Sequence, residues 1–115
     1  MTLANEIDAR AISQIPEEVE ADLQDPMRPD RVSPAYSIAF METGESMLDR
    51  AGEISKPVLL VHGTADRLTD HGASRELAQR AGNHVAYFEV EGGYHELHHD
   101  LKRHEVLNHI LKWID

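Results

Sequence analysis

The sequence contains no cysteine and few lysines. The absence of cysteine from all 115 residues excludes disulfide bonds, thiolate metal sites and cysteine nucleophiles. The lysines are Lys56, Lys102 and Lys112, and 21 acidic residues outnumber 11 basic residues to give a formal net charge of -10. Because no basic stripe is available to hold phosphates, nucleic acid is not expected as a partner.

Long apolar runs are also missing. No stretch approaches the roughly 20 apolar residues that a membrane-spanning helix needs. The opening residues, MTLANEID, lack the positive end and the apolar centre of a signal peptide. We therefore expect a soluble, cytoplasmic protein, and a chain of 115 residues is expected to form one domain at most.

The residues that are present follow helical and strand patterns in turn. Pro16 before a run of glutamates, and Ser33 before Pro34, are typical helix starts. The uninterrupted apolar run Val58–Val61 indicates a strand covered on both faces, as in a parallel sheet. The expected elements are helices near 16–24 and 34–51, a strand at 58–61, a helix near 73–81, a strand at 85–90 and a last helix capped by Asp100.

This order of elements predicts an α/β fold, in which two parallel strands are flanked by helices. Two strands are too few for a stable sheet, and the outer edge of the strand at 58–61 would expose unpaired main-chain groups. We therefore expect a further segment to pair with that edge, supplied by a separate N-terminal half or by a second copy of the chain.

Two side chains with catalytic chemistry follow the two predicted strands. Asp66 lies just past the first strand and His95 just past the second, where functional groups gather in open α/β sheets. A histidine can take a proton from a hydroxyl nucleophile, while a carboxylate orients the ring and stabilises the imidazolium. A helix cap or turn role for Asp66, and a simple loop role for His95, remain equally open on spacing alone.

The stretches around these residues resemble a known family. HGTADRLTDHGASRELAQRAG and EGGYHEL are similar to the segments that carry the catalytic Asp and His of monoacylglycerol lipases and lysophospholipases, within the α/β-hydrolases. The resemblance implies that Asp66 is the triad acid and His95 the triad base. It also implies the end of a helical cap at 1–32, the C-terminal part of the hydrolase core at 33–115, a monoacylated lipid or small ester as substrate, and no cofactor.

The chain departs from that family in lacking the nucleophile. No G-x-S-x-G motif occurs, and its nearest approach is Ser46 in GESML, inside a helical pattern without a preceding strand. We therefore expect an acid and a base without their serine, inactive as an isolated chain unless a serine-bearing N-terminal half completes it. The alternative is a non-catalytic, truncated chain or module that self-associates or pairs with such a half.

A second pattern involves the same histidine. His95-Glu96-Leu97-His98-His99 matches H-E-x-x-H, in which two histidines one helical turn apart bind zinc beside a glutamate base. The motif needs a continuous helix, whereas the glycine pair just before it favours a loop, so a zinc hydrolase is the less favoured alternative. These histidines, with His104, are also expected to bind nickel or zinc adventitiously. His62 is interpreted as a structural residue at the strand end, with a place lining the site as the alternative.

Overall fold

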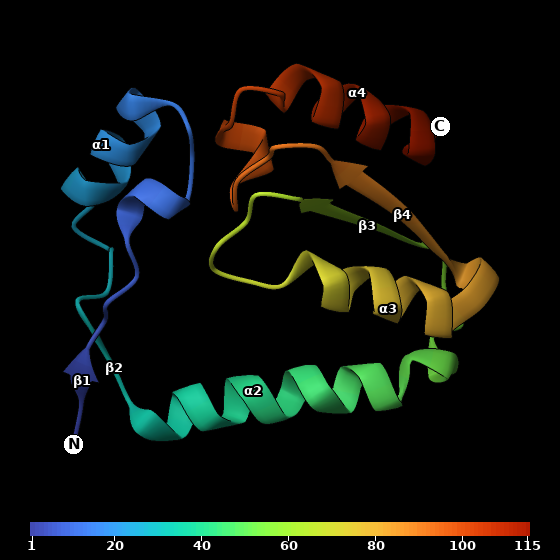
Figure 1. The fold of residues 1–115 in the computed structure, drawn as a ribbon, viewed down its shortest axis with the longest axis horizontal. Helices are drawn as coiled ribbons and strands as arrows, with labels where there is room; N and C mark the ends of the chain where they lie inside the picture. Colours follow the sequence, from blue (N-terminus) through green and yellow to red (C-terminus); the bar gives the residue numbers. More distant parts are fainter.

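A pair of parallel strands lies at the centre of the chain, which is described over residues 1–115 by a computed structural model. Strand β3 (Val58–Gly63) pairs with β4 (Val85–Val90) in the register Val58 to Val85 through Gly63 to Val90, and helix α3 (His71–Ala81) connects them. Helix α4 (Arg103–Ile114) covers one face of the pair and α3 the other, with α2 (Pro34–Asp49) outside α3 (Figure 1). The predicted α/β arrangement is confirmed.

The side chains of β3 bind this sheet to helices on both faces. Leu60 packs on a cluster around Ala81 of α3, whereas the next residue, Val61, packs on a cluster around Val106 of α4. Successive residues of a strand point to opposite faces, so one strand supplies both clusters. An uninterrupted apolar run is what such a strand requires.

The helix starts are set by local caps. Helix α1 (Pro16–Gln24) begins at its proline as predicted. Ser33 caps α2, where its hydroxyl accepts a hydrogen bond from the Tyr36 N–H at 3.1 Å. Helix α3 begins at His71, two residues earlier than expected, because the Asp70 carboxylate accepts the Gly72 N–H at 2.8 Å.

The prediction that Asp100 caps the last helix is wrong. Helix α4 begins at Arg103, and Lys102 at its N-cap makes no side-chain cap. Asp100 is instead almost fully buried, and its carboxylate accepts the N–H of Gln14 at 2.9 Å and that of Tyr94 at 2.7 Å. A buried carboxylate needs hydrogen-bond donors, and the N–H groups of Gln14 and Tyr94, in segments packed around Asp100, supply them.

The segment just before α1 lies beside the loop that follows β4 (Figure 1). A short antiparallel ribbon, β1 (Leu3–Ala4) with β2 (Arg31–Val32), closes this part, and sequence patterns did not indicate it. The segment before α1 is bonded to the loop, since the Glu96 N–H donates to the Ile12 carbonyl at 2.8 Å and the Ser13 hydroxyl to the His99 carbonyl at 2.6 Å. The division into a cap end at 1–32 and a core at 33–115 stays a prediction.

The second edge of β3 is free, because the sheet has only two strands. Helices lie on both faces, yet Val58 is 36% exposed and the following strand residues are only half-buried.

Only 13 of 115 residues are buried, and the radius of gyration is 15.7 Å, against about 13 Å for a compact domain of this length. Apolar residues are exposed along α2 and α4, among them Ile38, Phe40, Met41, Leu107, Leu111 and Ile114. None of the helices is both long and apolar enough to cross a bilayer.

The loops after β3 and β4 touch at two glycines. A side chain at Gly63 would collide with the backbone carbonyl of Gly93. The loops are joined there by hydrogen bonds from the Ala65 N–H to the Gly93 carbonyl and from the Thr64 N–H to the Val90 carbonyl, each 3.0 Å. Only glycine allows this close approach of two backbones.

We expect Gly63→Ala to lower the free energy of unfolding by about 1–3 kcal/mol, because the loops must separate to admit the methyl group. Urea unfolding followed by circular dichroism measures the change. Gly44→Ala is the matched control, since nothing lies within 4 Å of the added methyl group in α2. It should raise stability by about 0.5–1 kcal/mol. Equal effects of the two substitutions would contradict the close approach.

Candidate active site

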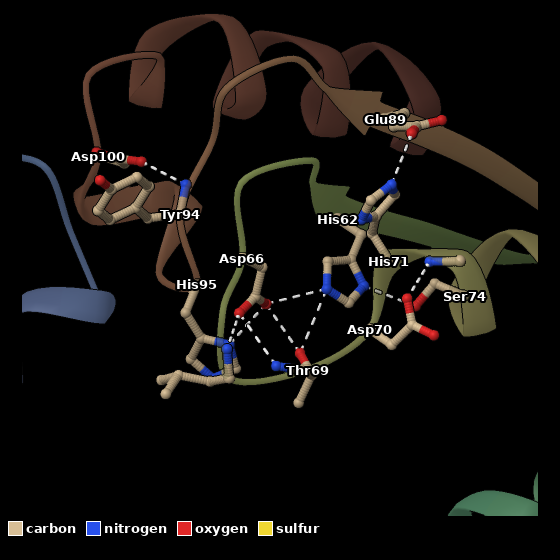
Figure 2. A network of polar contacts seen from close by, with 12 residues as sticks. His62, Asp66, Thr69, Asp70, His71, Ser74, Glu89, Tyr94, His95 and Asp100 are labelled. Atoms are coloured by element: carbon tan, nitrogen blue, oxygen red, sulfur yellow. Dashed lines mark hydrogen bonds and ion pairs between the residues drawn. The ribbon is translucent and has the colours of Figure 1, made fainter. Parts of the chain in front are cut away.

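The two joined loops bring one carboxylate and one imidazole together. Asp66 follows β3 and His95 follows β4, and the His95 Nδ1 lies 2.9 Å from the Asp66 Oδ2 (Figure 2). The Asp66 side chain is 2% exposed, whereas that of His95 is 38% exposed. A buried carboxylate thus holds a partly exposed imidazole whose other ring nitrogen makes no hydrogen bond.

Asp66 accepts hydrogen bonds at both carboxylate oxygens. Oδ1 accepts the backbone N–H groups of Leu68 at 2.8 Å and Thr69 at 3.1 Å. Oδ2 accepts from the Thr69 hydroxyl at 2.8 Å, and the nitrogens of His95 and His62 each lie 2.9 Å from it. Burial raises the pKa of Asp66, but the hydrogen bonds from His95, Leu68 and Thr69, that of His95 first, outweigh it and lower the pKa to about 2. Asp66 is therefore a carboxylate at neutral pH.

The carboxylate determines which nitrogen of each neutral ring carries the proton. An ionised carboxylate only accepts hydrogen bonds, so His95 donates through Nδ1 and His62 through Nε2. The Nε2 of His95 is left with a free lone pair, which is the form a general base requires. The Nδ1 of His62 is left to accept the Ser74 hydroxyl, 2.7 Å away (Figure 2).

His62 is the site residue that the sequence interpretation undervalued. Its side chain is 12% exposed and lies between Ser74 on α3 and Asp66, on the side of the carboxylate away from His95 (Figure 2). The available signal was its position near the end of β3, four residues before the carboxylate. The sequence favours a structural role for His62, whereas in the structure this residue of β3 also contacts the Asp66 carboxylate and so lines the candidate site.

The residues of the H-E-x-x-H pattern do not form one helix. His95 lies at a bend in the loop after β4, and the 3-10 turn η4 (Leu97–His99) follows it. His95 points to Asp66, whereas His99 contacts Glu96 at 3.1 Å. The structure thus does not place the two histidines one helical turn apart. Ser46 lies within α2, as the pattern indicated.

Comparison with known proteins identifies the family. A family model described as serine aminopeptidase, S33, matches residues 1–102. The chain belongs to this family. It is 36% identical over 110 residues to a monoacylglycerol lipase of Mycolicibacterium smegmatis, and this match covers 94% of this chain and 39% of that protein. It is 30% identical over 115 residues to an uncharacterised abhydrolase domain-containing protein of Dictyostelium discoideum, covering 98% of this chain and 12% of that one.

Solved structures give the same result for the fold. A monoacylglycerol lipase of Paleococcus ferrophilus superposes with a TM-score of 0.92 at 30% identity, over 98% of this chain and 45% of that one. A soluble variant of the Saccharomyces cerevisiae monoglyceride lipase gives a TM-score of 0.86 at 19% identity, over 100% of this chain and 43% of that one. The chain is therefore the C-terminal portion of an α/β-hydrolase fold, and it spans less than half the length of these relatives.

We expect His62 to carry its proton on Nε2 and His95 on Nδ1 when the rings are neutral, because both nitrogens face the Asp66 carboxylate. A long-range proton–nitrogen correlation spectrum of the histidine side chains above pH 8 reports both tautomers. In Asp66→Leu the preference should be lost for both rings, whereas His104, an exposed residue on α4, should be unchanged. A proton on Nδ1 of His62 in the wild-type chain would contradict the hydrogen bonding described here.

The pKa of Asp66 predicts an acid-labile contribution to stability. Because folding lowers the pKa from an ordinary value of 3.8 to about 2, the folded chain favours the carboxylate. The contribution, about 2 kcal/mol, is present above pH 4 and is lost as the pH falls through 2. Urea unfolding between pH 7 and pH 2 should show a shallower acid decline for Asp66→Asn. The exposed control Asp30→Asn should follow the wild-type curve, and parallel curves for Asp66→Asn and the wild type would contradict the assignment.

Proposed function

We propose that this chain supplies the acid and the base of a serine ester hydrolase of the acylglycerol lipase and lysophospholipase class. The observation that supports it most is the contact between the buried Asp66 carboxylate and the His95 imidazole at 2.9 Å, in a ring whose side chain is 38% exposed. Asp66 is the triad acid and His95 the triad base. The substrate class comes from relatives named as monoacylglycerol lipases.

The chemistry assigns one task to each residue. The His95 Nε2 takes the hydroxyl proton of a serine as the serine oxygen attacks the ester carbonyl, and Asp66 holds the ring and stabilises the imidazolium. His95 then returns the proton to the departing alcohol, which leaves an acyl-serine. Water, deprotonated by the same nitrogen, attacks the acyl-serine, and His95 passes that proton to the departing serine oxygen as the fatty acid is released. His62 keeps Asp66 oriented throughout.

The serine and the oxyanion-binding groups must come from another polypeptide segment. Ser46, the nearest sequence approach to a nucleophile motif, lies in α2 rather than on a strand-to-helix turn. The free edge of β3 offers unpaired backbone groups to such a segment. Beside it, an apolar groove of about 660 Å³ between α2 and α3 includes Phe40, Met41 and Leu77. We infer that the serine-bearing half of the fold pairs with this edge and fills this groove.

A chimera tests the assignment directly. The chain would replace the matching 110-residue segment of the Mycolicibacterium smegmatis monoacylglycerol lipase, to which it is 36% identical. We expect the chimera to hydrolyse a monoacylglycerol and to react with a fluorophosphonate at its serine. His95→Ala and Asp66→Asn should each reduce kcat by about 10³–10⁴-fold. His104→Ala, on the exposed face of α4, is the matched control and should retain activity.

The outcomes of the chimera experiment separate the two candidate functions. Full activity in His95→Ala or Asp66→Asn would overturn the triad assignment. A folded chimera without activity would favour the alternative, in which the chain is a non-catalytic module that uses its free edge to self-associate or to bind a partner. Circular dichroism and sedimentation of the chimera establish whether it is folded and monomeric.

A further inference from the structure

Three metal-binding side chains lie together just past His95, outside the contact with Asp66. Glu96, His98 and His99 each offer one ligand atom, and these atoms lie within 4.8 Å of one another. The two histidines are exposed and Glu96 is half-buried, so a solvated ion can reach all three. Leu97, which lies between Glu96 and His98 in the chain, is buried.

The backbone that carries these side chains is held in place. The Glu96 N–H donates to the Ile12 carbonyl at 2.8 Å, and the Ser13 hydroxyl donates to the His99 carbonyl at 2.6 Å. The ligand atoms are already close, since the His99 Nδ1 lies 3.1 Å from a Glu96 carboxylate oxygen. Little rearrangement would be needed for one ion to contact the set.

The donor set is one that zinc prefers. Two imidazoles and one carboxylate are common ligands of Zn²⁺ in proteins. A further carboxylate oxygen, from Glu18 on α1, lies 3.8 Å from the His99 Nδ1, and Arg103 contacts the other oxygen of Glu18. The net charge of -10 adds a general attraction for cations.

We propose that Glu96, His98 and His99 form a zinc site separate from the Asp66–His95 pair. This differs from the H-E-x-x-H interpretation, which would use His95 and His99 with Glu96 as a base. Here His95 is not one of the clustered ligands, since its ring is directed to Asp66, and Glu96 is a ligand rather than a base. The ion would brace the turn that follows the His95 loop.

Zinc titration of the whole 115-residue chain, free of any histidine tag, tests the site by isothermal calorimetry with ZnCl₂. We expect one zinc ion per chain. His98→Ala and Glu96→Gln should each weaken zinc binding at least about tenfold. His95→Ala should bind zinc as the wild type does, and so should His104→Ala, a matched control on exposed α4. His98 is exposed, so its loss removes no core contact, and circular dichroism of each variant checks the fold.

Two results would overturn the proposal. If His95→Ala abolishes zinc binding and His98→Ala retains it, the metal uses the H-E-x-x-H residues instead. If His98→Ala and His104→Ala weaken binding equally, or if no zinc binds at stoichiometric concentration, the three side chains form no site and the histidines bind metal only adventitiously.

Discussion

The Asp66 carboxylate is the acceptor on which the geometry of the site depends. It takes hydrogen bonds from its own loop, from His62 on β3 and from His95 on the neighbouring loop. The pairing of β3 with β4 brings the loops that follow them side by side, and the hydrogen bonds of Asp66 then set the distance between those loops. These hydrogen bonds also keep the buried group ionised, since a carboxylate with several donors costs far less to bury than one without.

That arrangement requires the loops after β3 and β4 to approach closely, which glycines at the contact allow. Gly63 and Gly93 touch where the strands end, and the parallel register of β3 and β4 brings both strand ends to the same edge. The Asp100 carboxylate joins the His95 loop to the segment before α1, because it accepts the N–H groups of Tyr94 and Gln14. The segment preceding the first helix therefore supports the His95 loop, although it lies more than 75 residues away in sequence.

Away from the site, the chain leaves a strand edge unpaired and apolar side chains exposed. One edge of β3 has no partner, and the outer faces of α2 and α4 expose apolar side chains. The relatives are more than twice as long as the segment they share with this chain. Pairing the strand edge and burying the apolar area would stabilise such a surface. The longer relatives contain additional chain that could do both.

Local signals in the sequence determined much of the fold: the strand of Val58–Val61, the Ser33 cap before Pro34, and the positions of Asp66 and His95 past the strand ends. These depend on residues within one turn or one strand of each other. Tertiary structure alone decided that His62 orients Asp66, that Asp100 binds Gln14 rather than capping a helix, and that His98 and His99 gather away from His95. Such contacts depend on how separate segments pack. The spacing of residues along the chain does not indicate which distant hydrogen-bond donor will reach a given side chain.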